Sequence, residues 1–153
     1  MPMADAFRLL LPIRLVTVEA EIRGHISPGD ERITDILQRG DTFRILPQGA
    51  RPDPEHWLEI SPDGIQIVIP PPLVSPPERR QARQPSTVFV RAGPYEVSGT
   101  AHLQPGSEAD LVSRSTHPFL PLTDAVLVAP SHDPETLDVV IVNLRLTTEY
   151  RVV

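Results

Sequence analysis

The chain has 153 residues, which is room for one ordinary domain or two very small ones. A net charge of −6 disfavours non-specific nucleic-acid binding, and the absence of cysteine excludes disulfides, thiolate metal sites and cysteine nucleophiles. The 19 prolines, together with 40% hydrophobic but only 5% aromatic residues, predict short strands, rigid corners and an aliphatic core.

The N-terminal segment is apolar, but its uninterrupted apolar run covers only residues 9 to 13. A membrane span needs about 20 residues, so we expect no membrane-spanning segment. Arg8 and Arg14 flank the run, and no cleavage site of small residues follows a longer apolar stretch. We therefore expect no signal peptide and a cytoplasmic location.

Residues 7 to 27 are predicted to form one or two strands, because apolar and polar residues alternate there with a period of two. Gly24 stands inside this pattern, which predicts a bulge or a close approach of two backbones. Pro28 and Gly29 then predict a turn.

A short helix is predicted after that turn. Asp30 is a candidate N-cap, and Gly40 can end the helix in the left-handed conformation. Helices shorter than about 12 residues are marginal in water, so this helix must pack on a sheet. Its apolar face consists of Ile33, Ile36 and Leu37.

Two further strand regions complete the first half. "DTFRIL" (residues 41 to 46) has the composition of a strand. "HWLEISPDGIQIVI" (residues 56 to 69) predicts a hairpin that turns at Ser61–Gly64, because proline suits the second place of a type I turn and glycine tolerates the positive φ that follows.

Residues 70 to 86 interrupt the pattern. Five of their first eight residues are proline, which predicts a stiff polyproline II connector between a first lobe (1–69) and a second lobe (87–153). The connector also carries a basic cluster of Arg79, Arg80 and Arg83. Arginine side chains of this kind either stay solvated or bind phosphate.

The second half repeats the same order of features. Residues 87 to 103 are extended, Pro105 and Gly106 predict a turn, and Ser107 with Asp110 has the spacing of a capping box at the start of a short helix. "FLPLTDAVLV" (residues 119 to 128) predicts a strand. Residues 137 to 153 predict a long strand or a pair of strands.

The two halves match in parts of their sequences as well. "EIRG" at 21–24 matches "EVSG" at 96–99, and "LEISPDGIQI" at 58–67 matches "VIVNLRLTTE" at 140–149. We interpret this as an internal duplication, although short β-rich segments can also resemble one another by chance. The expected fold class is mainly β (β-rich α+β), with two pseudo-repeated β-β-α-β-β lobes that dock together or fuse into one pseudo-twofold barrel-like unit.

The second half also resembles a family of small uncharacterised bacterial proteins. The pattern of that family is G-x-[IV]-x-x-P-x-G, then F-L-P-L-T-D-A, then a closing strand with V-N. Residues 87 to 146 match it well through Phe119, Thr123, Asp124 and Asn143, whereas residues 14 to 69 match only as a degenerate copy. The resemblance implies an architecture and no activity.

Catalytic signals are weak. No pair of histidines has the spacing of a helical zinc site, and the nucleophile-elbow, phosphate-loop and dinucleotide motifs are absent. Asp124 stands in an apolar strand, where we expect Asp124 or Thr123 to bind a nearby backbone group. We expect no enzyme and no cofactor. The five histidines, for which strand-end positions are the expected alternative to a metal site, are His25, His56, His102, His117 and His132.

The internal duplication, the lack of catalytic motifs and the apolar C-terminus "YRVV" favour a non-catalytic protein-interaction module, either a homo-oligomer or an accessory subunit of a larger bacterial assembly. Contacts are expected from strand edges, the C-terminal strand and the proline-rich connector, and nucleic acid is not an expected partner. The alternative is a small-ligand or cyclic-nucleotide sensor that uses Arg79, Arg80 and Arg83. A metal-dependent enzyme that uses the histidines is the third hypothesis.

Overall fold

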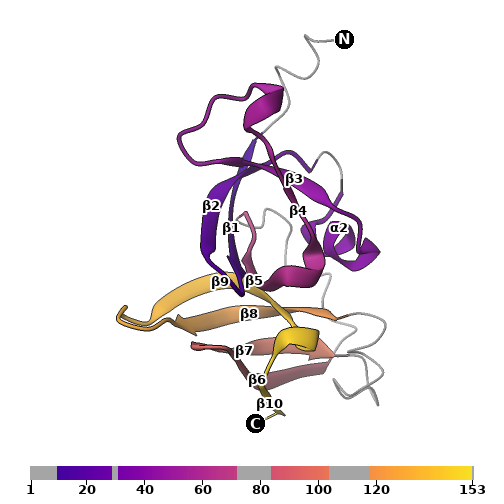
Figure 1. Ribbon diagram of the computed structural model, residues 1–153. Helices are drawn as coiled ribbons and strands as arrows, with labels where there is room; N and C mark the ends of the chain where they lie inside the picture. Colours follow the sequence, from indigo (N-terminus) through magenta and orange to yellow (C-terminus); the bar gives the residue numbers. More distant parts are fainter. Residues whose placement is uncertain (1–9, 29–30, 72–83, 104–117, 153) are drawn as a thin grey trace.

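The computed structural model describes residues 10–28, 31–71, 84–103 and 118–152. Its strands form a ten-stranded sheet in which all neighbours run antiparallel (Figure 1). In the described ranges the sheet is accompanied by one α-helix, α2 (Ile33–Arg39), and by short 3₁₀ turns. The mainly β prediction is confirmed.

We call residues 11–69 lobe 1 and residues 84–152 lobe 2. Lobe 1 contains β1 (Leu11–Thr17), β2 (Glu21–Ile26), α2, β3 (Phe43–Pro47), η1 (Pro54–His56), β4 (Leu58–Ile60), η2 (Pro62–Gly64) and β5 (Ile65–Ile69). Lobe 2 contains β6 (Gln84–Ala92), β7 (Tyr95–Leu103), β8 (Phe119–Val128), β9 (Glu135–Asn143), η4 (Leu144–Leu146) and β10 (Glu149–Val152). The last three residues of the predicted connector, 84 to 86, thus belong to β6.

Each lobe has five strands, one more than the predicted β-β-α-β-β arrangement, and the strand order is the same in both lobes. Lobe 1 is ordered β5-β1-β2-β3-β4, lobe 2 is ordered β10-β6-β7-β8-β9, and β9 pairs with β5 to join them. The sheet does not close: of the strands described here, β10 and β4 each pair with one neighbour only and stand at opposite ends (Figure 1). The expected barrel-like closure is therefore not formed by these strands.

Two glycines allow neighbouring strands to approach closely. A Cβ atom at Gly24 of β2 would lie 2.3 Å from the carbonyl oxygen of Leu46 in β3. A Cβ atom at Gly99 of β7 would lie 3.0 Å from the carbonyl oxygen of Thr123 in β8, where the β7–β8 register shifts. Both glycines therefore stand where any side chain would push two backbones apart.

The helix lies where its apolar face predicts. Ile36 and Leu37 are buried against the sheet, and Gly40 ends the helix with a left-handed φ of 78°. The N-cap position is Arg32, without a side-chain cap, and the predicted cap Asp30 lies outside the described residues. No helix in the described part of the chain is long and apolar enough to cross a membrane.

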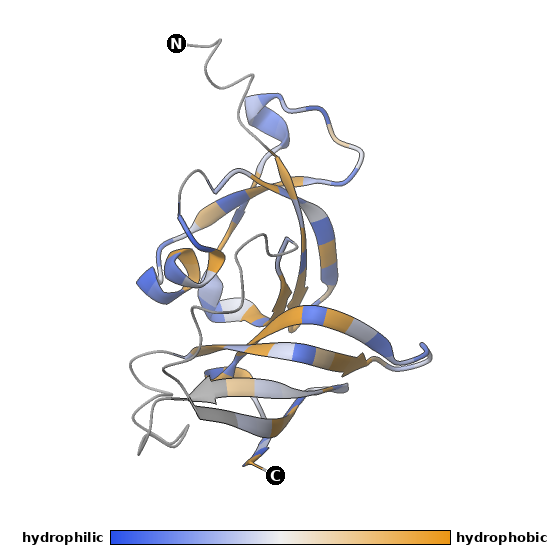
Figure 2. Ribbon diagram, turned by 180° about the vertical axis from the view of Figure 1, so that it is seen from behind, coloured by the Kyte–Doolittle hydropathy of each residue, from blue (hydrophilic) through white to orange (hydrophobic). Residues whose placement is uncertain are grey.

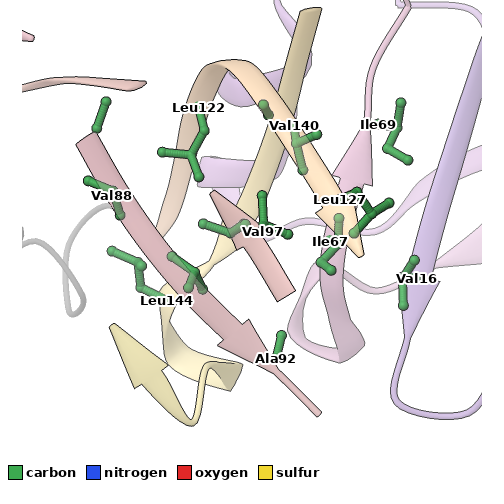
Figure 3. Packing of buried hydrophobic residues seen from close by; sticks show 14 residues of the cluster. Val16, Ile67, Ile69, Val88, Ala92, Val97, Leu122, Leu127, Val140 and Leu144 are labelled. Atoms are coloured by element: carbon green, nitrogen blue, oxygen red, sulfur yellow. The ribbon is translucent and has the colours of Figure 1, made fainter. Parts of the chain in front are cut away.

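The lobes contribute residues to each other's hydrophobic cores. Hydrophobic and hydrophilic residues alternate along several strands (Figure 2). Figure 3 shows residues of lobe 1 beside the core of lobe 2. The lobe 2 core includes Val16, Ile67 and Ile69 of lobe 1. The lobe 1 core includes Phe119, Val139 and Ile141 of lobe 2. Apolar side chains on the outer face of each lobe at the joint are thereby buried.

Candidate functional site

The joint between the lobes is fixed by polar groups as well as by apolar packing. Asn143, which is 2% exposed, donates from Nδ2 to the Ile65 carbonyl at 2.8 Å and accepts from the Arg145 N–H at 3.0 Å. Gln38 of α2 donates to the Phe119 carbonyl at 2.9 Å. These bonds connect the end of β9 to β5, and β8 to α2, so the two lobes hold a defined relative position.

An ion pair between Arg14 and Glu135 connects β1 of lobe 1 to β9 of lobe 2. Arg14 Nη1 lies 2.7 Å from Glu135 Oε2, and Arg14 Nε lies 3.2 Å from Glu21 Oε1. Partial burial lowers the pKa of Arg14, but the hydrogen bonds and charges of Glu135 and Glu21 outweigh it and leave that pKa raised. The hydrogen bond from Arg14 is the main cause of the lowered pKa of Glu135.

Two hollows in the surface both include Arg14 and Arg23 in their linings. The first has a volume of about 370 Å³, and its polar lining groups are Arg14, Arg23, His25, Gln48 and Asp138, set among proline and aliphatic side chains. The second, of about 330 Å³, includes His132 and Asp133 in its lining. The first hollow has the volume and the mixed polar and apolar lining of a small-ligand site, and its guanidinium groups suit an anion.

The histidines do not come together as a metal site. His25 lines one hollow and His132 the other, while His56 lies in η1. His117 and the side chain of His102 lie outside the described residues. Asp53, Glu55 and His56 place potential ligand atoms within 4.8 Å of one another, but all three are exposed and would leave an ion open to water. We assign no metal to this cluster.

The sequence predicts that Asp124 or Thr123 binds a nearby backbone group, and Thr123 does so. Asp124 is not buried, although the strand around it is apolar. Its side chain is exposed, and its φ of 49° places the backbone in the left-handed region, at the register shift between β7 and β8. Aspartate tolerates this conformation better than most residues, which accounts for an acidic residue within an apolar strand. The Thr123 hydroxyl donates to the Thr100 carbonyl at 3.3 Å, as expected of one of these two residues.

The other residues selected from the sequence fall into two groups. Phe119 is 5% exposed in the lobe 1 core, and the Pro28 carbonyl accepts from the Glu31 N–H at 3.2 Å. The remainder lie outside the described residues, and these are Arg79, Arg80, Arg83, Pro105, Ser107 and Asp110.

The edge strand β10 has an apolar inner face and a charged outer face. Tyr150 and Val152 lie opposite Val90 and Val88, which are buried in the lobe 2 core. Val152 is 52% exposed because no described strand covers its other side. The outer face carries Glu149 and Arg151, joined by an ion pair of 2.9 Å.

The edge strand β4 at the other end of the sheet has the same character. Leu58 lies opposite the buried Ile45, and it is 42% exposed. Glu59 lies opposite Arg44 on the outer face and accepts a hydrogen bond from Thr42 at 2.9 Å. Each edge strand therefore has a partly exposed apolar side chain on its inner face, Val152 or Leu58, and charged side chains on its outer face.

No family model matches this chain, and no curated protein or solved structure matches it. The resemblance to the F-L-P-L-T-D-A family consequently stays a prediction. Any functional assignment must rest on the geometry of the edges and of the hollows.

Sequence reasoning selected Phe119 and Asn143, but it missed their partners and the Arg14–Glu135 pair that also connects the lobes. Arg14 and Glu135 are separated by 121 positions, and Gln38 and Phe119 by 81, so no local pattern connects either pair. An arginine within a strand beside apolar neighbours was the available signal, because a partly buried cation requires a partner. That signal identifies Arg14 but not the acid that pairs with it.

Proposed function

We propose that this protein is a non-catalytic interaction module, an accessory subunit that binds an extended segment of a partner protein along β10. The observation that carries the proposal is the open β10 edge, where Val152 faces inward and yet is 52% exposed. An added strand would cover that side chain and hydrogen-bond to the N–H and C=O groups that point away from β6.

The two faces of β10 define the chemistry of the partner segment. Apolar side chains would lie beside Tyr150 and Val152 on the inner face, and polar or charged ones beside Glu149 and Arg151 on the outer face. A single strand leaves the outer face in water, so the charges there need not be desolvated. The partner is therefore expected to supply an alternating segment and not an apolar surface.

We further propose that the two lobes are copies of one ancestral unit. The common strand order supports this, and so does the register of the first hairpin in each lobe. Ile13 lies opposite Gly24 and Val88 opposite Gly99. Three residues further along β1 and along β6, the opposite residue is a glutamate in each lobe. Val16 lies opposite Glu21, and Arg91 lies opposite Glu96.

The test uses three matched lysine substitutions. Val18, Leu58 and Val152 are the large hydrophobic residues that are exposed in the described ranges, and they lie in a turn, on β4 and on β10. We expect Val152→Lys to abolish recovery of a partner by the tagged protein in its native host, because an inward-facing lysine blunts an edge strand. Val18→Lys and Leu58→Lys should retain that partner. Equal recovery by all three variants would contradict a site on β10.

A second candidate function is the binding of a small organic anion in the hollow beside Arg14. Arg23, whose side chain is 58% exposed, and Arg14 both line this hollow, and aliphatic side chains form the rest of its wall. Titration of cyclic dinucleotides and of simple carboxylates, followed by NMR, tests it. Shifts at His25 and Gln48, which also line this hollow, should vanish in Arg23→Ala but persist in Arg80→Ala if the hollow binds the anion, and the reverse would favour the connector cluster.

A further inference from the structure

The joint between the lobes provides a template for how two copies of the chain would join. In that joint the last strand of lobe 1, β5, pairs with the fourth strand of lobe 2, β9. The two open edges are the complementary pair: β10 is the last strand of lobe 2, and β4 is the fourth strand of lobe 1. Repetition of the joint between molecules would place β10 of one copy on β4 of the next, in a head-to-tail contact.

The ladders identify which residues of β10 correspond to those of β5. Val16 and Arg91 occupy the same place in their lobes, and they lie opposite Ile67 and Glu149 respectively. Two residues further along each strand, Ile69 corresponds to Arg151. The outer-face isoleucines of β5 are thus replaced by a glutamate and an arginine on β10.

The fourth strands correspond through the 3₁₀ turns that follow them. Ser61 precedes η2 and Asn143 precedes η4, each as the N-cap residue. Counting back two residues from each cap gives Glu59 in β4 and Ile141 in β9. Ile141 is 2% exposed within the lobe 1 core, whereas Glu59 is exposed.

The joint is therefore apolar at three positions where the open edges are charged. Ile67 and Ile69 are 0% and 8% exposed because lobe 2 covers the outer face of β5. Head-to-tail pairing would carry Glu149 and Arg151 into the same surroundings on β10, and it would bury Glu59 of the next copy. Charges removed from water without new partners strongly oppose association.

We propose that Glu59, Glu149 and Arg151 prevent copies of this chain from joining head to tail, so that its sheet edges admit a single added strand but reject a second lobe. The charges on β10 are also held in place. Arg151 lies with its guanidinium carbon 4.7 Å from the centre of the Phe89 ring, and Arg91 contacts Glu149 at 3.9 Å. Outward-held charges are a known device against edge-to-edge association.

This device would act whether or not a partner strand binds β10, and its test does not involve a partner. Two variants are compared by sedimentation velocity at micromolar concentrations. The β10 variant (Glu149→Ile with Arg151→Ile) lacks the charges on β10, and the β4 variant (Glu59→Ile) lacks the charge on β4. Wild type and each variant alone should be monomeric. A mixture of the β10 variant and the β4 variant should form a one-to-one dimer. The triple variant should form larger species whose size grows with concentration.

A matched control separates specific edge pairing from non-specific association caused by the added isoleucines. Glu19, Glu31 and Arg39 are exposed and lie outside β4 and β10, and their replacement by isoleucine removes the same number of acids and bases away from both edges. This control should stay monomeric. The inference is overturned if folded edge variants remain monomeric on mixing, if the control associates equally, or if wild type already forms chains. Should the isoleucine variants not fold, Glu59→Gln, Glu149→Gln and Arg151→Gln together should still self-associate more than wild type, and their failure to do so counts against the inference.

Discussion

Gly24→Ala is expected to be strongly destabilising, because Gly24 has the closest Cβ contact among the glycines in the described part of the chain. The added Cβ would lie 2.3 Å from the Leu46 carbonyl oxygen, 3.0 Å from its carbon and 3.2 Å from Pro47 Cα, all of which are backbone atoms. No side-chain rotation relieves these contacts, so β3 must move. The β2–β3 ladder consists of Gly24 with Pro47 and His25 with Leu46, and a shift of β3 weakens both pairs.

The expected loss of unfolding free energy is about 3 kcal/mol, at the upper end of the usual range for overpacking. For a chain of this length the melting temperature should fall by about 6–12 °C. Gly99→Ala should cost about 1 kcal/mol, because its closest contact is 3.0 Å and one of its near contacts is the side chain of Leu122. Urea denaturation followed by circular dichroism measures both values.

Gly64→Ala is the control, since a Cβ atom there would meet nothing within 4 Å and its φ is not positive. This variant should lie within about 0.5 kcal/mol of wild type. Equal stability of Gly24→Ala and Gly64→Ala would refute the close approach of β2 and β3 and the packing argument built on it.

Three further substitutions test the joint and the β8 backbone. Asn143→Leu should cost about 2–3 kcal/mol in urea denaturation, because the Ile65 carbonyl loses its donor in a buried place, and a neutral result would contradict that bond. Because the pKa of Glu135 is lowered in the folded state, its ion pair with Arg14 stabilises the fold above the unfolded value of about 4.3 and is lost as pH falls through the folded value. Glu135→Gln should therefore be about 0.5 kcal/mol less stable than wild type at pH 7, with that difference gone in acid, and a difference independent of pH would contradict it. Asp124→Val should cost about 1–3 kcal/mol because of its positive φ, whereas Asp124→Asn should be near neutral, and equal melting temperatures would argue against the left-handed backbone.

Local features of the fold were accessible from the sequence. The period-two pattern predicted β1 and β2, and the apolar face with Gly40 predicted α2. The chain does turn at Ser61–Gly64, but the predicted hairpin is wrong: β4 pairs with β3, β5 pairs with β1 and β9, and Gly64 has no positive φ because it ends the 3₁₀ turn η2. The correct predictions depend on neighbouring residues alone, because turn chemistry and alternation act over a few positions. The C-terminal region also proved to be a pair of strands, β9 and β10, separated by η4.

The joint between the lobes was not accessible in the same way. Alternation reports which face of a strand is buried but not which strand lies beside it. β5 shows the difficulty, since all five of its residues are buried and its pattern does not alternate. The left-handed φ of Asp124 was not accessible either, because it depends on the register between β7 and β8, which the local sequence does not specify.

The central claim is that β10 is the contact strand, and photo-crosslinking in the native host tests it most directly. A photoreactive residue replaces Val152 in one strain and Val18 in another, which are both exposed valines. We predict that position 152 crosslinks one partner protein through a single extended segment of alternating apolar and polar residues, and that position 18 does not. The same set of proteins from both positions, or no crosslink from position 152, would contradict the claim.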